Sequence, residues 1–441
     1  MIDQKQILAN LGFQSLTPMQ EAMYQAGASR GGVVLLSPTG SGKTLAYLLP
    51  LVAQVDATVD SLQAVVVVPT RELAQQSEEV LRRMKTGLRA MALYGGRPAM
   101  QEHRVIRELK PQIVFATPGR LNDHLDKENL NAYGVRILVI DEFDKCLELG
   151  FQEEMNRIVT RVKQAQYSWL MSATDAEEIP AFMNRMASHF EQLNFLATQT
   201  HLEQRIEVKQ VVSPLRDKLE TLGHLLTDLK GTPAIVFVAH RESVERVGAW
   251  LKQEGFASVM YHGGMDQEVR ERALYKFRSG VANVLVSTDL AARGLDIPEV
   301  GAVVHYHLPL KAEDFTHRHG RTARWESLGC IYLITSPEEA LPDFVGEVAE
   351  CLVSTGAFRP VPSRYACIYI GRGKRDKLSK GDILGFLCKQ GGLTSADIGR
   401  IDVAAHHAYA AVLRTRVKGL LKQVAGEKIK GMKTLIEETR R

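Results

Sequence analysis

Short runs of consecutive apolar residues recur along most of the 441-residue chain, and each run is followed by a polar cluster and an amphipathic stretch. The runs are rich in β-branched residues that do not alternate with polar ones, which is typical of parallel strands covered on both faces. Helical stretches between the runs predict repeated strand–helix units and hence an α/β fold. The expected strands are 32–36, 64–68, 112–116, 136–140, 167–171, 234–238, 258–261, 284–287 and 302–305.

The strand–helix pattern occurs in two successive cycles. They predict two parallel-sheet domains, at residues 1–200 and 205–355, with a linker at about 190–210. The last segment, residues 361–441, has the expected order strand, helix, strand, strand, helix, strand, which predicts a small α+β domain. Its strands are expected at 365–370, 398–403, 408–413 and 428–436, and its helices at 380–389 and 417–425.

The last segment also contains tyrosines and basic residues that we expect to be exposed on its sheet. Exposed rings on such a sheet can stack on unpaired RNA bases, which favours an RNA-binding domain. A small dimerisation domain of the same class is the alternative.

Polar clusters close four of the strands expected in the first domain. The carboxyl ends of parallel strands meet at one edge of a sheet, and open α/β sheets bind ligands there. We therefore expect the functional groups of this domain at that edge. The clusters are residues 69–72, 117–120, 141–144 and 172–174.

Residues 37–44 read Ser-Pro-Thr-Gly-Ser-Gly-Lys-Thr and lie between an expected strand and a helix-prone segment. Gly40 and Gly42 can adopt backbone angles closed to other residues, so that N–H groups can converge on phosphate oxygens at the helix N-terminus. Lys43 supplies a positive charge and Thr44 a hydroxyl for magnesium. The pattern predicts a nucleotide site, with an ordinary glycine turn as the alternative.

Three more residues are candidates for the same site. Asp141 and Glu142 end an apolar strand, where phosphoryl transfer needs one carboxylate for magnesium and one to orient water. Gln20 would lie in the first turn of a helix that begins near Pro18, and its amide can pair with the N6 and N7 edge of adenine. Taken alone, Gln20 is more simply explained as an exposed surface residue.

Two arginines of the second domain, Arg321 and Arg324, are three residues apart and could face a γ-phosphate together, as arginine fingers do. Such a role requires a nucleotide between two domains. The histidines beside them could instead be metal ligands, but no cysteine or carboxylate set accompanies them in the sequence.

The formal charge of +4 conceals an asymmetry. Residues 361–441 contain 17 Lys and Arg against 7 Asp and Glu, a net charge of +10. Subtraction from the 55 basic and 51 acidic residues of the chain leaves 38 and 44 in residues 1–360, a net charge of −6. The basic excess favours a nucleic acid as the partner of the last segment, and a solvated basic surface is the alternative.

The sequence contains no apolar run long enough to cross a bilayer, so we expect a cytoplasmic protein with no membrane partner. The five cysteines are odd in number, scattered and without CxxC spacing. This pattern indicates neither a disulfide framework nor a zinc site.

Taken together, the motifs resemble those of the DEAD-box RNA helicases and follow the order of that family over residues 12–335. The resemblance implies two tandem RecA-like parallel-sheet domains of the α/β class, followed here by a small α+β domain that is RRM-like. It further implies ATP and Mg²⁺ as cofactors and RNA as partner.

The resemblance also implies roles for individual residues. For ATP binding these are Gln20, Thr39, Gly40, Ser41, Gly42, Lys43, Thr44, Gly294, Asp296, Arg321 and Arg324. For catalysis they are Lys43, Asp141, Glu142, Arg321 and Arg324, with Thr44 and Asp141 as magnesium ligands. For RNA contact they are Pro69, Thr70, Arg71, Gly96, Thr117, Pro118, Gly119, Arg120 and Thr288. For coupling hydrolysis to strand separation they are Asp144, Ser172, Thr174 and His317.

This sequence departs from the family pattern at a few positions. Phe143 replaces the usual alanine, Ala323 the usual glycine and His319 the usual isoleucine. Phe143 keeps both flanking acids, so hydrolysis should survive. The family's upstream aromatic residue would fall near Asp3, where this chain has none, so adenine stacking should be weaker or supplied by another residue.

The stretches 371–377, 381–385, 398–402 and 428–431 resemble the DbpA-type RNA-binding domain. The resemblance implies that Lys374, Arg375 and Lys377 contact RNA and that the domain docks on a structured hairpin of large-subunit ribosomal RNA.

We therefore expect a monomeric ATP-dependent RNA helicase that unwinds short duplexes during large-subunit ribosome assembly, in a pre-ribosomal particle. An ATP-gated RNA clamp or assembly scaffold without productive unwinding is the alternative. A DNA translocase is disfavoured by the RNA-type last segment.

Overall fold

The computed structural model describes residues 4–38, 40–96, 99–174, 179–196, 206–289, 300–319 and 329–439, and structural statements refer to these. Within them, six side chains are not described: Ala99, Gln101, Glu313, Thr316, His317 and His319. The chain divides into two compact units. The first contains the described residues up to 196 and the second those from 206 onward.

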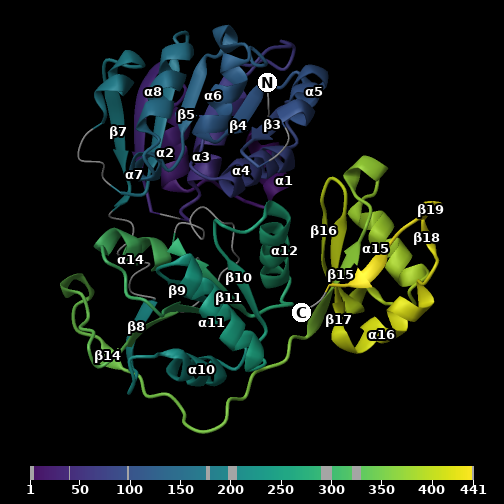
Figure 1. The fold of residues 1–441 in the computed structure, drawn as a ribbon. Helices are drawn as coiled ribbons and strands as arrows, with labels where there is room; N and C mark the ends of the chain where they lie inside the picture. Colours follow the sequence, from purple (N-terminus) through teal and green to yellow (C-terminus); the bar gives the residue numbers. More distant parts are fainter. Residues whose placement is uncertain are drawn as a thin grey trace. The chain divides into compact units, whose positions relative to one another are not determined.

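The first unit is built on a seven-stranded parallel sheet with the strand order β3-β4-β2-β5-β6-β1-β7 (Figure 1). The sheet contains every strand predicted for this domain. It also contains β3 and β7, which the sequence did not reveal. The strands are β1 (Gly31–Leu36), β2 (Ala64–Val67), β3 (Ala90–Leu93), β4 (Ile113–Ala116), β5 (Ile137–Ile140), β6 (Tyr167–Ser172) and β7 (Phe190–Asn194).

Helices cover both faces of this sheet. Strand side chains alternate between the faces, so Val66 joins one core while Val65 and Val67 join the other. Because both faces are covered, strands such as β2 are buried at every position, which explains their unbroken apolar runs. The helices are α1 (Gln4–Leu11), α2 (Pro18–Ala26), α3 (Lys43–Gln54), α4 (Arg71–Met84), α5 (Ala99–Leu109), α6 (Pro118–Asp126), α7 (Phe143–Glu148) and α8 (Gln152–Arg161).

The second unit begins with another seven-stranded parallel sheet, in the order β10-β11-β9-β12-β13-β8-β14. Its strands are β8 (Ile206–Val212), β9 (Ala234–Val238), β10 (Ser258–Tyr261), β11 (Val284–Thr288), β12 (Ala302–His305), β13 (Gly329–Thr335) and β14 (Ala349–Glu350). Among the helices described here are α10 (Leu219–Asp228), α11 (Arg241–Gln253), α12 (Gln267–Arg278) and α14 (Ala312–His319).

The same unit ends in a small domain with a four-stranded antiparallel sheet, in the order β16-β17-β15-β20. Helices α15 and α16 pack on its inner face, where Ile368, Ala410 and Leu387 share one core. The sheet strands are β15 (Tyr365–Ile370), β16 (Ile398–Val403), β17 (Ala408–Leu413) and β20 (Ile436–Glu438). The helices are α15 (Lys380–Lys389) and α16 (Arg414–Gln423), and the hairpin β18 (Lys428–Ile429) and β19 (Met432–Lys433) precedes β20.

Three expectations about secondary structure need correction. The expected linker at 190–210 contains β7 at one end and the start of β8 at the other, because both strands extend the parallel sheets. The single final strand expected at 428–436 is instead the hairpin β18–β19 followed by β20, since Gly431 takes a positive φ of 77° and turns the chain. Helix α16 begins three residues earlier than expected.

Candidate active site and RNA-contact edge

The polar clusters of the first unit follow the carboxyl ends of its strands, and the strand order sorts them into two groups. Strands β3, β4 and β2 form one half of the sheet, and the predicted RNA-contact residues follow them. Strands β5, β6 and β1 are neighbours in the other half, and they precede the predicted nucleotide and coupling residues. One edge of the sheet therefore presents two adjacent sets of groups, as binding at strand carboxyl ends requires.

The phosphate loop connects β1 to α3. Gly40 and Gly42 have positive φ values of 82° and 93°, as the sequence predicted from their freedom to adopt such angles. The Lys43 ammonium donates hydrogen bonds to the carbonyl oxygens of Ser37 (2.5 Å) and Pro38 (2.9 Å). The Ser41 N–H also donates to the Pro38 carbonyl, at 3.3 Å. In this structure the loop is thus closed on itself, and Lys43 would have to leave these carbonyls to reach a phosphate.

Gln20 is buried rather than exposed on the surface. It lies in the first turn of α2, where it forms a reciprocal capping box with Thr17. Its Nε2 donates to the carbonyl oxygen of Gly42 at 3.4 Å, and a Cβ added to Gly42 would lie 2.6 Å from that same nitrogen. The structure therefore joins the predicted adenine reader directly to the predicted phosphate loop.

The two catalytic candidates that follow β5 differ in environment. Asp141 is 3% exposed, and burial raises the pKa of its carboxyl, an effect that the nearby Lys43 ammonium opposes. Glu142 has a left-handed backbone, with φ 48° and ψ 51°, and its N–H donates to Asp141 Oδ1 at 2.9 Å. A non-glycine residue in this region is strained, and such strain is concentrated at functional sites. The sharp turn places two adjacent acids in different surroundings.

A tyrosine that sequence reasoning did not single out also contacts this site. Tyr47 lies one helical turn after Thr44 in α3 and is fully buried. Its hydroxyl is hydrogen-bonded to Ser77 Oγ, at 3.1 Å, and to the side chain of Asp141. Burial raises the pKa of Tyr47, so the phenol stays protonated and able to donate. The sequence could not reveal this residue, because a tyrosine at that position also fits a helix core.

The predicted coupling residues of the first unit are brought together. Thr174 donates a hydrogen bond to Asp144 Oδ2 at 3.0 Å, and Ser172 Oγ donates to the Thr174 carbonyl at 2.6 Å. These contacts link the start of α7 to the end of β6. Phe143, which replaces the usual alanine, is 1% exposed and packs in the same core as Cys146, so its ring does not displace Asp144 from Thr174.

In the RNA-contact half, two predicted residues lie against each other. Gly96 has a φ of 92°, and a Cβ there would meet the Arg71 guanidinium at 2.5 Å. Glycine is therefore needed for the close approach of Arg71 to this turn. Thr70 caps α4 by accepting a hydrogen bond from the Leu73 N–H, and it follows Pro69, which lies just beyond β2.

The next cluster follows β4. Thr117 is the N-cap residue of α6, and Pro118 and Gly119 form the first turn of that helix. Arg120 Nε donates to the buried carboxylate of Glu102 at 2.7 Å, and His124 Nε2 lies 3.0 Å from the same oxygen. Arg120 is thus held by an ion pair with Glu102 within its own unit. To contact RNA as expected, it would have to do so while still paired with Glu102.

In the second unit, an arginine to which the sequence analysis gave no role, Arg318, makes several buried contacts. The Arg318 guanidinium of α14 donates to both carboxylate oxygens of Asp289, at 2.5 and 2.6 Å, and to the His307 carbonyl at 2.9 Å. It is 4% exposed and lies over the ring of Phe237. This bidentate pair joins the end of β11, where Thr288 is half-buried, to the helix that contains His317.

Several predicted residues lie outside the described part of the chain. These are Thr39, Gly294, Asp296, Arg321 and Arg324, together with the departure at Ala323. The side chains of His317 and His319 are also not described. The roles expected of these residues remain predictions.

Three family models match successive parts of the chain. DEAD/DEAH box helicase matches residues 17–182, helicase conserved C-terminal domain matches 217–326, and DbpA RNA binding domain matches 367–438. The chain is 33% identical over 434 residues to ATP-dependent RNA helicase DbpA of Escherichia coli, which covers 96% of this chain and 94% of that protein. The chain belongs to the DEAD-box family of ATP-dependent RNA helicases.

Other relatives agree with this assignment. DEAD-box ATP-dependent RNA helicase CshA of Bacillus subtilis is 34% identical over 343 residues, covering 76% of this chain and 68% of that protein. Among solved structures, Saccharomyces cerevisiae Dbp5 bound to RNA and ADP BeF3 matches with a TM-score of 0.70 and 25% identity, over 80% of this chain and 94% of that one. The two parallel sheets of this helicase are RecA-like domains, and its enzymatic activity is that of an RNA-stimulated ATPase and helicase.

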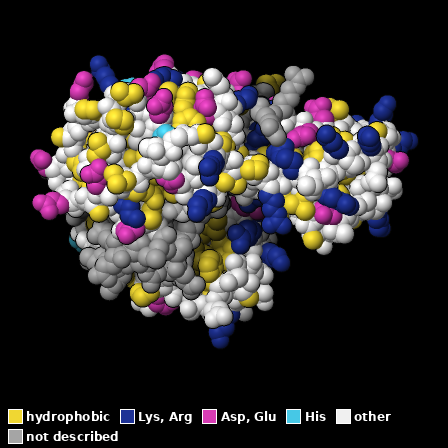
Figure 2. All heavy atoms as spheres, turned by 90° about the horizontal axis from the view of Figure 1, so that it is seen from below, with side chains coloured by type: hydrophobic (Ala, Val, Ile, Leu, Met, Phe, Trp, Pro, Cys, Tyr) yellow, Lys and Arg dark blue, Asp and Glu magenta, His cyan; other side chains and the backbone are white. Residues whose placement is uncertain are grey.

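The basic residues predicted for RNA contact in the C-terminal domain of the helicase lie at one turn. Lys374, Arg375 and Lys377 are exposed there. A Cβ at Gly373 would lie 2.5 Å from the Ala404 carbonyl oxygen, so the turn requires glycine for its close approach to the β16–β17 loop. In Figure 2, where this domain lies to the right, Lys and Arg side chains are scattered over the visible face.

The expectation that the tyrosines of the C-terminal sheet are exposed is wrong for its central strand. Tyr409 of β17 is 4% exposed, and Tyr365 and Tyr369 of β15 are partly buried. The covering residues come from the second RecA-like domain, which the sequence pattern could not indicate.

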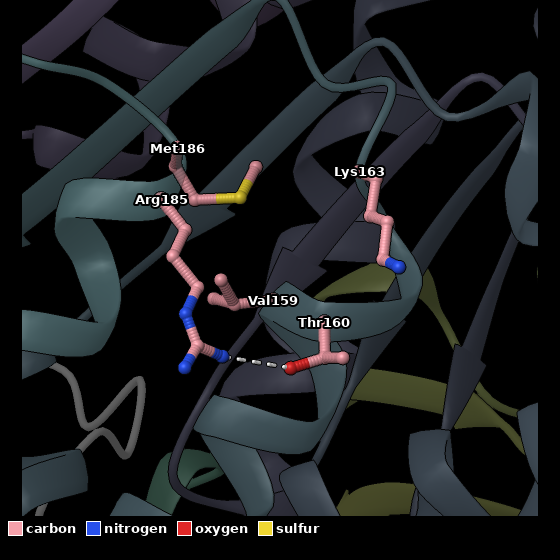
Figure 3. A pocket seen from close by; sticks show the side chains of 5 residues that line it. All are labelled: Val159, Thr160, Lys163, Arg185 and Met186. Carbon is pink, nitrogen blue, oxygen red and sulfur yellow. Dashed lines mark hydrogen bonds between the residues drawn. The ribbon is translucent and has the colours of Figure 1, made fainter.

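A hollow of about 380 Å³ in the first unit lies apart from these clusters (Figure 3). It is lined by Val159 and Thr160 of α8, by Lys163 just after that helix, and by Arg185 and Met186 at the end of a short 3-10 helix that follows β6. Arg185 already donates to Thr160 Oγ1 and Asn156 Oδ1, each at 3.3 Å. None of the predicted site residues lines this hollow. Separately, no helix in the described part of the chain is long and apolar enough to span a membrane.

Proposed function

We propose that the helicase opens short RNA duplexes near a ribosomal RNA hairpin that its C-terminal domain binds, and that it does so during assembly of the large ribosomal subunit. The observation that carries the proposal is the strand order of the first sheet, which places the residues predicted for nucleotide binding and those predicted for RNA contact in two adjacent halves of one edge, called here the nucleotide half and the RNA half. The exposed basic turn at Lys374, Arg375 and Lys377 supports an anchor on RNA. We propose a cytoplasmic monomer as the active form.

In the nucleotide half, Lys43 binds phosphate after release from the Ser37 and Pro38 carbonyls, and Gln20 reads adenine. Glu142, whose backbone is left-handed, orients the attacking water. The side chains of Arg321 and Arg324, from the second domain, stabilise the charge that develops on the γ-phosphate. Gly294 and Asp296 complete the ATP contacts.

A magnesium ion fits the donor set of this half. The Asp141 carboxyl is a group whose charged form a divalent cation would stabilise, against the burial that raises its pKa, and Thr44 adds a hydroxyl at the start of α3. When bound, the ion neutralises charge on the phosphates. Tyr47, as a hydrogen-bond partner of Asp141, keeps that carboxylate oriented.

In the RNA half, the N-termini of α4 and α6 and the turn at Gly96 contact the backbone of one strand. Arg71, held against Gly96, supplies the positive charge. Thr288 contributes from the second domain. Contact with the sugar 2′-hydroxyls distinguishes RNA from DNA, and a strand bent on this surface cannot remain in a duplex. The Thr174–Asp144 contact lies within the nucleotide half and supports a coupling role for these two residues, because Asp144 follows Glu142 by two residues.

Replacement of Glu142 by Gln tests the assignment. The variant keeps shape and hydrogen bonding but loses the carboxylate, so turnover should fall by about 100-fold or more, as for loss of a catalytic acid–base group. ATP-dependent RNA binding should persist, measured by fluorescence anisotropy with labelled RNA. RNA-stimulated ATPase at the wild-type level in this variant would overturn the assignment.

The alternative activity, an ATP-gated clamp that does not unwind, makes a different prediction. A strand-displacement assay with a short duplex beside the hairpin separates the two. Release of the displaced strand that depends on ATP and on the hairpin supports unwinding. ATP-dependent retention of both strands, with no release, would favour the clamp.

A further inference from the structure

The C-terminal sheet has an inner face covered by its own helices and an outer face that those helices do not touch. The outer face presents Cys367 and Tyr369 from β15 and Tyr409 from β17, because these positions alternate with the inner core residues. The ring of His407 lies 4.9 Å from that of Tyr409 and 5.7 Å from that of Tyr369. This aromatic face is the surface on which unpaired bases were expected to stack.

In the structure, helix α12 of the second RecA-like domain contacts this face. Tyr275 stacks on Tyr409 with a centroid distance of 5.1 Å and an interplanar angle of 28°. Its hydroxyl donates a hydrogen bond of 2.6 Å to the Arg400 carbonyl of β16. Tyr275, Cys367 and Tyr409 are 3%, 2% and 4% exposed and form one apolar cluster. A stacked pair, a hydrogen bond and a buried cluster therefore join residues of two domains.

Charged residues of α12 continue the contact along the sheet. Arg272, Glu271 and Glu268 precede Tyr275 by three, four and seven positions, so they lie on one side of the helix. Burial lowers the pKa of His407, and the nearby carboxylates of Glu268 and Glu271 oppose that effect. The same side of α12 therefore faces the C-terminal sheet from Glu268 to Tyr275.

The chain that connects the two domains is also fastened. Phe358 packs against Trp250, His224 and Phe256, with ring centroids 5.4, 4.9 and 6.1 Å away. A Cβ on Gly223 would lie 2.7 Å from the Phe358 ring, so glycine makes room for it. The Arg359 N–H donates to Thr227 Oγ1 at 3.2 Å. A fastened connection shortens the effective loop and lowers the entropic cost of docking the sheet.

We propose that α12 is the constitutive partner of the aromatic sheet face, so that the second RecA-like domain and the C-terminal domain move as one rigid body. Given the proposed function, ATP-driven movement of the second domain would then be transmitted directly to RNA held by the C-terminal domain. Bases do not stack on Tyr409 and Tyr369 in this arrangement, and the hairpin is held elsewhere on the domain.

The reactivity of a native cysteine, Cys367, can be used to measure how often this contact opens. Cys367 lies within the cluster, and burial raises the pKa of its thiol, so alkylation by N-ethylmaleimide should require opening of the interface. In the full-length Tyr275→Ala variant, which loses the stacked ring and the hydrogen bond, its alkylation rate should rise roughly 30-fold, as followed by mass spectrometry. Tyr275→Phe keeps the ring and should show a smaller rise, of roughly threefold.

Two controls accompany this measurement. Cys146, in the core of the first domain, should stay protected in every variant, which shows that the variants are folded. Tyr133→Ala removes a ring that is 82% exposed in the first unit and should leave Cys367 protected. Equal alkylation of Cys367 in the wild-type protein and in Tyr275→Ala would overturn the proposal.

RNA provides the second arm of the experiment. For a rigid coupling, hairpin RNA should leave Cys367 protected, and a rise in alkylation would show that bases displace α12 and would overturn the proposal. In Tyr275→Ala, unwinding beside the hairpin should fall while ATPase stimulated by unstructured RNA stays at the wild-type level. Unchanged unwinding by Tyr275→Ala would show that movement of the second domain does not reach the RNA through this contact, and would overturn that part of the proposal. A wild-type protein that protects Cys367 yet shows no RNA-stimulated ATPase would contradict the proposed function instead.

Discussion

The nucleotide half of the first sheet and the outer face of the C-terminal sheet represent two ways of building a functional surface. In the first, backbone conformation positions the functional groups. Gly42 and Glu142 have positive φ values, and the residues whose positions they determine lie within short contiguous motifs. In the second, the surface is formed by side chains such as Tyr409 and Tyr275, which are in contact although they lie 134 positions apart in the chain. Motifs of the first kind can be located from the sequence, whereas the partner of an aromatic face depends on the tertiary structure.

The largest effect expected from this comparison concerns Gly42. Replacement by Ala imposes a left-handed backbone on a residue with a Cβ, and that Cβ would collide with the Gln20 amide. Nucleotide affinity should fall by about 30-fold or more, since a left-handed residue costs about 1–2 kcal/mol before the collision is counted. Titration with a fluorescent ATP analogue measures it.

Gly87→Ala is the matched control for this variant. Gly87 has a similar φ of 77°, but a Cβ there meets nothing within 4 Å. It should reduce stability without changing nucleotide affinity. If both variants lost affinity equally, general destabilisation and not the geometry of the loop would explain the result.

A smaller effect is expected where the C-terminal domain itself depends on backbone geometry. Gly373→Ala would push a Cβ into the carbonyls of Ala404 and Ala405, at a cost of about 1–3 kcal/mol for overpacking. The amides of β15 should exchange faster, and preference for the hairpin over unstructured RNA should decline. Gly385→Ala adds a Cβ that meets nothing within 4 Å on α15, and it should slow amide exchange slightly. Equal exchange in the two variants would contradict the requirement for glycine in the basic turn.

The smallest effect is expected at Tyr47, a side chain that supports the nucleotide half, where backbone conformation positions most of the functional groups. Tyr47→Phe removes the hydroxyl that binds Asp141 and Ser77, worth about 0.5–1.5 kcal/mol. The magnesium concentration for half-maximal ATP binding should rise a few-fold, measured by titration at fixed nucleotide. Tyr94→Phe removes another buried hydroxyl, bonded to Gln75, and should leave that value unchanged. No shift for Tyr47→Phe would show that Asp141 is oriented without it.

The sequence predicted the two parallel sheets, the phosphate loop and the acids after β5, because unbroken apolar strands and glycine motifs are local signals. It did not reveal β3, whose short apolar run is ordinary in composition, or β8, which lies beside an expected linker. It also missed the Arg318–Asp289 pair, because neither residue is unusual alone and the two lie 29 positions apart in the chain. The burial of Tyr409 could not be predicted for the same reason: its covering helix belongs to another domain.

The fastening of Phe358 beneath Trp250 has a consequence for the evolution and engineering of this helicase. A gene fusion that joins the C-terminal domain to a foreign RecA-like core near residue 356 would transfer the basic turn and Phe358. It would leave behind Gly223 and Trp250, which contact Phe358, and Tyr275, which stacks on Tyr409. The functional unit is therefore encoded by separate parts of the gene. The residues of the second RecA-like domain that contact the C-terminal domain and its connecting segment must be transferred together with them. Exchange of RNA targets between such helicases should succeed more readily by altering Lys374 and its neighbours than by swapping whole domains.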